Sequence, residues 1–127
     1  VNVSLDEWLS HLDYGQLKRV SIQFPDPWFK RKHFKRRVLK ANLLNSIAKS
    51  MNKDGEIFIQ SDILKLIEYM SNTIDENIYF NRKYEEEIKF SDKNPYKAKT
   101  DRELFSLKKN LPIYRAMYIR NSLLFIN

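Results

Sequence analysis

Residues 19–28 read Arg-Val-Ser-Ile-Gln-Phe-Pro-Asp-Pro-Trp, and this stretch decides how the middle of the chain folds. The β-branched and apolar residues of 19–24 predict a strand. Pro25 and Pro27 follow, and each fixes its own φ near about −65° and favours extended backbone in the residue before it. Asp26 is therefore expected in a stiff turn at the end of a strand, with its carboxylate held in one direction.

The residues after this turn form the most basic segment of the chain. Six of the eight residues from Lys30 to Arg37 are lysine or arginine, and another is His33. The net charge of the chain is +7, so the positive charge is largely concentrated in this run. Such a run either forms a solvated helix face or attracts a polyanion, and its place beside a rigid acidic turn favours the phosphates of a nucleic acid.

The rest of the chain alternates between helical and strand-like spacing of apolar residues. We predict helices at 5–12, 43–51 and 63–74, a turn at 52–55, and strands at 19–24, 56–60, 78–84 and 112–120. The segment between the third strand and Lys99 is expected to be irregular. Strands that alternate with helices of this length are typical of an open α/β sheet, in which ligands bind beyond the carboxyl ends of the strands.

Two acidic residues occupy that position. Asp26 and Asp62 each follow a predicted strand. If the two strands are parallel neighbours, both carboxylates face one crevice at the same edge of the sheet. Asp62 has a simpler alternative, as the cap of the helix that follows it.

Several motifs resemble, in the right order, those of the tRNA (guanine-N7)-methyltransferases. They are Phe24-Pro25-Asp26-Pro27-Trp28 with the basic run after it, Gly55-Glu56 leading to Ser61-Asp62, Thr100-x-x-Glu103, and Pro112-Ile113-Tyr114-Arg115-Ala116. The first motif is highly specific, whereas Thr-x-x-Glu is weak by itself. Members of this family methylate a variable-loop guanosine of tRNA, with S-adenosylmethionine as the methyl donor.

The resemblance implies the later part of a class I methyltransferase. We expect residues 1–127 to form a single α/β domain, the C-terminal part of a Rossmann-like sheet with helices on both faces and an antiparallel last strand. The cofactor half of such a sheet has a glycine-rich turn, whereas this chain has only Gly15 and Gly55 and begins with Val1. We interpret the chain as a C-terminal fragment that lacks the N-terminal cofactor-binding half and is inactive alone.

The resemblance also implies roles for individual residues. Asp26 is expected where methyl donor and guanine meet, as the catalytic residue and a cofactor contact, and Asn2 as the remnant of an adenosine contact. The expected substrate-binding residues are Lys30, Asp62, Thr100, Asp101, Arg102 and Glu103. The expected RNA-binding residues are Lys32, His33, Phe34, Lys35, Arg36 and Arg37. Structural alternatives are a turn former for Asp26 and a capping box for Thr100 with Glu103.

The composition bears on whether the chain has disulfides, thiolate sites, metal sites or membrane spans. The chain has no cysteine, which excludes disulfides and thiolate sites and fits a reducing cytoplasm, and with two histidines we expect no metal site. No apolar run approaches the length of a membrane span, so we expect no membrane as a partner. The resemblance to the methyltransferases implies tRNA as the partner.

Two other functions remain open. One is a nucleic-acid methyltransferase that acts on an exocyclic amine, although such enzymes usually carry an Asp/Asn-Pro-Pro-aromatic turn and this chain has one proline on each side of Asp26. The other is a basic RNA-binding module without catalysis.

Overall fold

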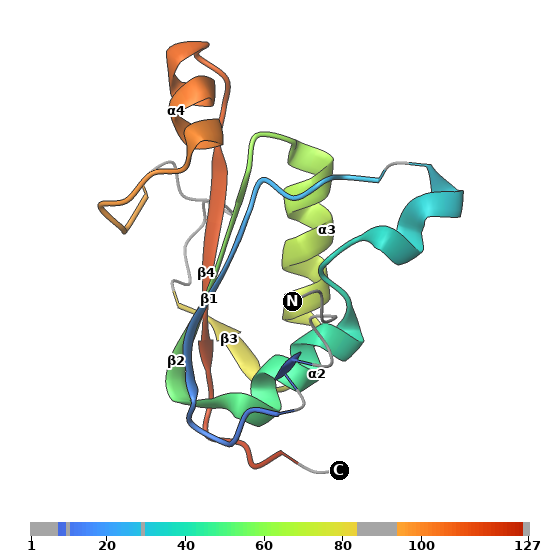
Figure 1. The fold of residues 1–127 in the computed structure, drawn as a ribbon, viewed down its shortest axis with the longest axis vertical. Helices are drawn as coiled ribbons and strands as arrows, with labels where there is room; N and C mark the ends of the chain where they lie inside the picture. Colours follow the sequence, from blue (N-terminus) through green and yellow to red (C-terminus); the bar gives the residue numbers. More distant parts are fainter. Residues whose placement is uncertain (1–7, 10, 29, 84–93, 126–127) are drawn as a thin grey trace.

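A computed structural model describes residues 8, 9, 11–28, 30–83 and 94–125. The described part is an α/β structure built on a four-stranded sheet in the order β1-β2-β4-β3 (Figure 1). The strands are β1 (Leu17–Gln23), β2 (Met51–Ser61), β3 (Phe80–Arg82) and β4 (Tyr114–Arg120). The helices are the 3-10 helix η1 (Arg31–Arg36) and the α-helices α2 (Ala41–Ser50), α3 (Leu64–Asp75) and α4 (Asp101–Lys108).

The strands that precede the two acidic loops are parallel neighbours. β1 pairs with β2 in parallel, and Gln23 lies beside Gln60 at their carboxyl ends. β4 is antiparallel to both β2 and β3. The predicted α/β class and the predicted antiparallel last strand are therefore confirmed. Asp26 and Asp62 both follow strands that end at the same edge of the sheet.

One face of the sheet is covered by α2 and α3 (Figure 1). Ile57 and Ile59 of β2 belong to the core on this side and are fully buried, as is Tyr118 of β4. Leu44 on α2 and Ile67 on α3 pack into the same core. These apolar residues recur at helical spacing on the helices and at every second position on β2, which is why the sequence predicts both kinds of element.

The opposite face of β2 is more polar. Phe58, 1% exposed, packs edge-on against Tyr96 with ring centroids 5.1 Å apart. Gln60 follows on the same face and lies beside Arg115 of β4. Both polar side chains are almost completely buried. Burial of polar groups is costly unless they are hydrogen-bonded, so their partners identify a built polar cluster.

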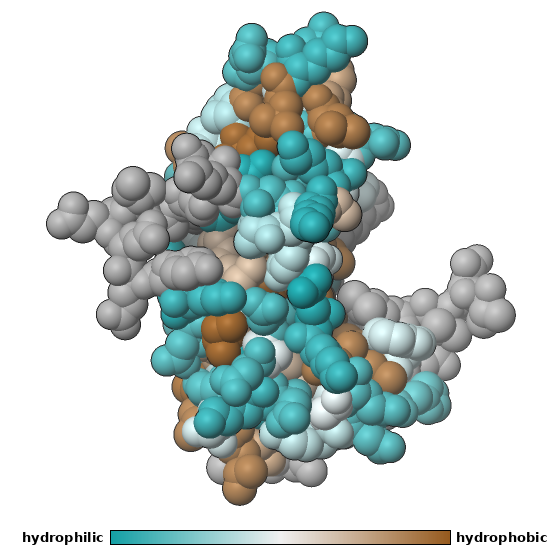
Figure 2. Space-filling view, turned by 90° about the vertical axis from the view of Figure 1, so that its left-hand side faces the viewer, coloured by the Kyte–Doolittle hydropathy of each residue, from teal (hydrophilic) through white to brown (hydrophobic). Residues whose placement is uncertain are grey.

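The helix α4 is amphipathic in the reverse of the usual sense. It buries Glu103 and Ser106, whereas Leu104, Phe105 and Leu107 are 51%, 45% and 46% exposed. The exposed apolar side chains gather at the end of the molecule where α4 lies (Figure 2). Apolar spacing does not predict this helix, because its buried face carries polar residues; only the capping-box alternative for Thr100 with Glu103 indicates its start.

The turn predicted at 52–55 is an irregularity inside β2. Leu17 pairs with Met51, but Arg19 pairs with Glu56, so residues 52–55 are displaced from the parallel pairing. A Cβ on Gly55 would lie 2.3 Å from Cγ of the buried Met51. Only a residue without a side chain fits there, so the glycine serves close packing where we expected a turn.

The other predicted elements lie near their observed positions. The helix predicted at 63–74 is α3, and the strands predicted at 19–24 and 112–120 are β1 and β4. The strand predicted at 78–84 is shorter, and its last residue lies outside the described residues. Of the helix predicted at 5–12, residues 8 and 9 are helical, whereas residues 11 and 12 are not, so the prediction is wrong at this end.

Candidate functional site

The loop that follows β1 is fastened to the end of β2. The Phe24 amide donates a 2.9 Å hydrogen bond to the Gln60 carbonyl oxygen. Phe24 and Trp28 have φ values of 49° and 46°, which residues other than glycine seldom adopt. The Asp26 turn therefore lies between two strained backbone positions, a pattern that is frequent at functional sites.

Asp26 is exposed within this turn. Its Oδ1 accepts a 3.2 Å hydrogen bond from the Trp28 amide, which forms the Asx turn expected as the structural alternative. This turn is compatible with a chemical role, because the hydrogen bond fixes the direction of an exposed carboxylate.

The basic run begins in solvent and ends against the Asp26 loop. Residues 30–32 are exposed. Arg37 Nε donates a 3.0 Å hydrogen bond to the Pro27 carbonyl oxygen, and the guanidinium lies 4.4 Å from the centre of the Tyr69 ring. Arg37 thus holds the loop against α3. The sequence predicted an RNA contact for Arg37 and did not predict this structural contact.

The 3-10 helix η1 carries the middle of the basic run. His33 is half-buried and its ring meets the Trp28 ring edge-on, with centroids 5.3 Å apart. The two aromatic residues therefore brace each other beside the Asp26 turn. The backbone of residues 34–36, which include Phe34, Lys35 and Arg36, completes this helix.

Asp62 is held by α4. Its Oδ2 accepts hydrogen bonds from the Arg102 guanidinium at 2.6 Å and from the Ser106 hydroxyl at 3.5 Å, and its side chain is 7% exposed. The alternative that Asp62 caps the next helix is wrong. The Ile63 amide donates to the Ser61 hydroxyl oxygen at 3.1 Å, and the ion pair with Arg102 directs the Asp62 carboxylate toward α4.

Thr100 caps α4, as the Thr-x-x-Glu pattern predicts. Its Oγ1 accepts a 3.1 Å hydrogen bond from the Glu103 amide. The Glu103 side chain turns toward the sheet instead of back to Thr100, so only half of the expected capping box forms. Asp101, in the first turn, is exposed.

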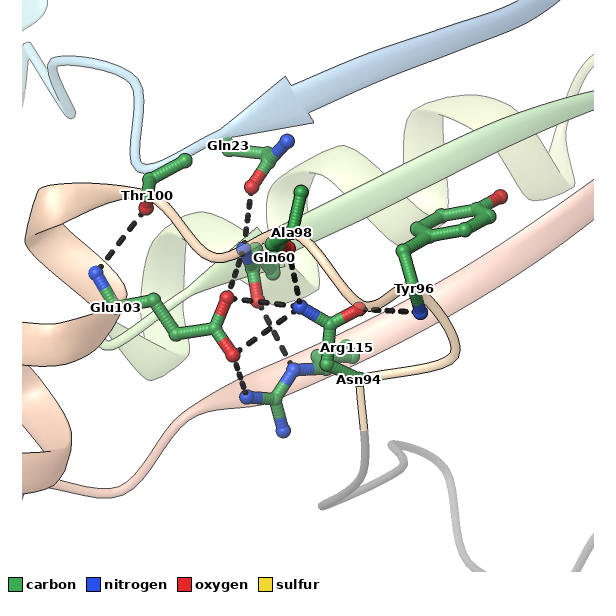
Figure 3. Close-up of polar contacts among 8 residues, drawn as sticks. All are labelled: Gln23, Gln60, Asn94, Tyr96, Ala98, Thr100, Glu103 and Arg115. Atoms are coloured by element: carbon green, nitrogen blue, oxygen red, sulfur yellow. Dashed lines mark hydrogen bonds and ion pairs between the residues drawn. The ribbon is translucent and has the colours of Figure 1, made fainter.

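Glu103 is the centre of the polar cluster (Figure 3). Its side chain is fully buried, and its Oε2 lies 2.9 Å from Nη2 of Arg115, which is itself 4% exposed. Its Oε1 accepts a 3.2 Å hydrogen bond from Gln60 Nε2. Two strands thus present donors to one carboxylate that α4 carries.

Gln60 joins this carboxylate to the Asp26 loop. Its Oε1 accepts a 2.9 Å hydrogen bond from Arg115 Nε, and its Nε2 donates to Gln23 Oε1 at 2.6 Å as well as to Glu103. Gln23 is the last residue of β1 and lies three residues before Asp26. A continuous set of hydrogen bonds therefore runs from the end of β1 across β2 and β4 to α4 (Figure 3).

Asn94 covers the remaining side of Glu103. Its Nδ2 lies 2.9 Å from Oε1 and 3.2 Å from Oε2 of the carboxylate. Its Oδ1 accepts a 2.8 Å hydrogen bond from the Tyr96 amide. The Asn94 carboxamide is thereby held in one orientation, with its NH₂ group directed at Glu103 (Figure 3).

Sequence reasoning missed four residues of this cluster: Gln23, Gln60, Asn94 and Arg115. Gln60 directly follows the apolar run 57–59 of β2 and Arg115 directly precedes the apolar run 116–119 of β4, and a polar residue that continues a buried strand requires a buried partner. That signal was available in the sequence. Asn94 carries no comparable local signal.

Three carboxylates belong to this edge of the sheet, and they differ in environment. Asp26 is exposed, Asp62 is paired with Arg102, and Glu103 is buried among amide and guanidinium donors. Carboxylates accept hydrogen bonds from N–H groups and oppose positive charge. The carboxyl edge of β1 and β2 thus gathers acidic side chains where open α/β sheets bind their ligands.

Three expectations concern absent features or undescribed residues. Asn2 lies outside the described residues. Within the described ranges, no group of three or more His, Cys, Asp or Glu side chains is placed to hold a metal ion. No helix in that part of the chain is both long and apolar enough to cross a membrane.

A protein-family model described as "Putative methyltransferase" matches residues 4–116 of the chain. The chain is 81% identical over all 127 residues to a tRNA (guanine-N(7)-)-methyltransferase of Prochlorococcus marinus (strain NATL1A), and covers 59% of that relative. It is 46% identical over 121 residues to the protein of the same name from Parasynechococcus marenigrum (strain WH8102), and covers 51% of it. The chain thus spans between half and three fifths of the length of these curated relatives.

Proposed function

The chain belongs to the methyltransferase family that matches residues 4–116, and we propose that it is the C-terminal part of an enzyme that methylates N7 of a guanine in the variable loop of tRNA. Its relatives over the whole chain carry the name of that activity. The observation that carries the proposal is the joining of the Asp26 loop, Asp62 and Glu103 at the carboxyl edge of β1 and β2. Open α/β sheets bind their ligands at that edge.

Asp26 is the proposed catalytic residue. Guanine N7 already has a free lone pair, so no proton has to be removed before it attacks a methyl group. Positive charge then develops on the base. A carboxylate fixed by the Trp28 amide aligns the base and opposes this charge, which is electrostatic catalysis and not general-base catalysis.

Glu103, Asp62 and Thr100 form the proposed base-binding side of the site, with Asp101 and Arg102 in the same turn. Guanine presents two adjacent N–H donors, at N1 and at the 2-amino group, and a carboxylate is the acceptor that matches them. Arg115 and Gln60 hold the Glu103 carboxylate from the side of the sheet. A pocket with such an acceptor rejects adenine, which has no N–H at N1.

The basic run is the proposed tRNA contact. Residues 30–32 are exposed beside the Asp26 turn, so Lys30 and Lys32 are available to phosphates close to the reacting base. His33 and Arg37 support the loop from within. We propose that Phe34, Lys35 and Arg36 extend this contact along the backbone of the tRNA.

The family implies S-adenosylmethionine as the donor, which supplies an electrophilic methyl group on a sulfonium sulfur. The described residues do not provide the glycine-rich cradle that such a cofactor needs. Gly15 and Gly55 lie at the amino ends of β1 and β2, away from the candidate site. We propose that Asp26 and Asn2 contribute contacts and that most of the cofactor site belongs to the remaining part of the longer protein.

The test uses a chimera in which this chain replaces the matching segment of the 81% identical relative. The chimera is incubated with unmodified tRNA and S-adenosylmethionine, and the digested product is analysed by mass spectrometry of its nucleosides. We expect 7-methylguanosine. Methylation of an exocyclic amine would replace the proposal by the related enzyme class, and tRNA binding without methylation would favour a binding module.

A further inference from the structure

The full burial of Glu103 conflicts with a direct contact to a base. Its side chain is 0% exposed, and both carboxylate oxygens already accept hydrogen bonds. A carboxylate whose acceptor positions face protein donors cannot also bind a ligand at those positions. If Glu103 reads the guanine of the proposed reaction, one of its protein donors has to leave.

The donors to Glu103 differ in how firmly they are placed. Gln60 and Arg115 belong to paired strands and also bind each other, so their removal would break the sheet cluster. Asn94 comes from an irregular segment, and its bonds to Glu103 are only partly buried. Of the three residues, Asn94 is therefore the one that can be displaced locally.

The NH₂ group of Asn94 offers Glu103 the same kind of N–H donor that the edge of a guanine base offers. Its NH₂ group reaches both oxygens of Glu103, at 2.9 Å and 3.2 Å, as N1–H and the 2-amino group of guanine would. We infer that the Asn94 carboxamide occupies the position of the guanine donor edge on Glu103, so that the substrate base and Asn94 compete for one carboxylate. This inference rests on the proposed function, because it takes guanine to be the ligand.

The contacts of the Tyr96 ring, two residues after Asn94, allow Asn94 to be displaced by itself. The Tyr96 ring packs on Phe58, and the Arg19 guanidinium lies 4.1 Å from the centre of the same ring. Release of Asn94 breaks its bonds to Glu103, to the Tyr96 amide and to the Ala98 carbonyl oxygen but leaves these ring contacts in place. In the enzyme without substrate, the hydrogen bonds of Asn94 therefore satisfy the Glu103 carboxylate. The apparent affinity of the enzyme for the base is reduced by the fraction of molecules in which Asn94 is bound to Glu103.

Two variants distinguish the NH₂ donor of Asn94 from the turn that its Oδ1 forms with the Tyr96 amide. Asn94→Ala removes both the NH₂ donor and the oxygen that accepts from the Tyr96 amide. Asn94→Asp keeps that acceptor, removes the donor and places a like charge against Glu103. Asn72→Ala, at an exposed asparagine of α3, is the matched control.

The measurement is the dissociation constant of the chimera for free guanosine, inosine and adenosine, which carry no phosphate and so avoid the basic run. We expect both Asn94 variants to bind guanosine about three- to tenfold more tightly than the unmodified chimera, inosine to gain by a similar factor because its N1–H needs the same carboxylate, and adenosine to gain nothing. The control variant should leave all three constants unchanged. Circular dichroism of each variant confirms that it is folded.

A gain in affinity is an outcome that structural damage does not produce. Weaker or unchanged guanosine binding in both folded variants would overturn the inference, as would an equal gain for adenosine. If the unmodified chimera forms 7-methylguanosine while the variants show no gain, the inference fails and the proposed function stands. If the variants gain guanosine affinity but no tRNA is methylated at N7, the proposed function fails instead.

Discussion

The Arg115 guanidinium lies 2.9 Å from the Glu103 carboxylate, and the two side chains are 4% and 0% exposed. The pair joins β4 to α4, which packs no apolar face on the sheet. Removing one partner leaves an uncompensated buried charge, whereas replacing both by apolar residues of similar size is often neutral. The ion pair therefore fixes the position of α4 more than it adds to overall stability.

Arg115→Met is expected to lower the free energy of unfolding by about 3–5 kcal/mol, because it leaves Glu103 buried without its cation. The double variant Arg115→Met with Glu103→Met should recover most of this loss. Urea denaturation of the single and double variants measures the coupling. Lys83→Met, which breaks the more exposed pair with Glu56, is the control and should cost much less. Additive losses in the double variant would show that the two side chains act independently.

Asp26→Asn in the chimera should lower the single-turnover rate of methylation by about two to three orders of magnitude, the range for loss of one preorganised electrostatic contact. Binding of tRNA should barely change, because we propose that the basic run supplies most of the affinity. Rapid-quench methylation and filter binding are measured on the same preparation. Glu76→Ala, at an exposed acidic residue after α3, is the control. Normal methylation by the Asp26 variant would reduce this residue to a turn former.

Lys32 and Arg37 should respond differently to substitution. Lys32→Ala is expected to reduce the logarithmic salt slope of tRNA binding by about one and to leave the rate with bound tRNA unchanged. Arg37→Ala should also lower that rate, because Arg37 holds the Pro27 carbonyl of the Asp26 loop. Filter binding at several salt concentrations and single-turnover rates separate the two effects. Lys53→Ala, at the other end of β2, should alter neither.

Tyr118 predicts how stability depends on alkaline pH. Its burial raises the pKa of the phenol well above the ordinary value, so the folded protein favours the protonated form more than the unfolded chain does. The resulting stability is fully present below the unfolded pKa of about 10 and is lost as pH rises above it. Urea denaturation between neutral and alkaline pH should show this loss, and Tyr118→Phe should diminish it. An equally steep alkaline loss in the phenylalanine variant would assign it to other groups.

The sequence predicted what depends on local periodicity. The strands beside Asp26 and Asp62, and the helix α3, follow from apolar spacing within a few residues. The polar cluster does not, because Gln60 is separated from Gln23, Glu103 and Arg115 by 37, 43 and 55 residues. No local pattern states which buried polar groups meet across a sheet.

Two of the local errors have equally physical causes. Apolar spacing does not predict α4 because its inward face is polar. Asp62 was considered as a helix cap because Asp is common at a strand-to-helix turn. The neighbouring Ser61 supplies the acceptor instead, and Arg102 from α4 engages the carboxylate.

The displaced residues 52–55 act on the site from the far end of the sheet. Met51 packs against Gly55, and this packing fixes the register in which β2 pairs with β1. A shift of this register by one residue would turn Gln60 to the apolar face of the sheet, since neighbouring residues of a strand face opposite sides. Gln60 would then lose its hydrogen bond to Gln23. The absence of a side chain at Gly55 thus helps to set the alignment of the loops that follow β1 and β2, although both loops lie at the opposite end of the parallel pairing.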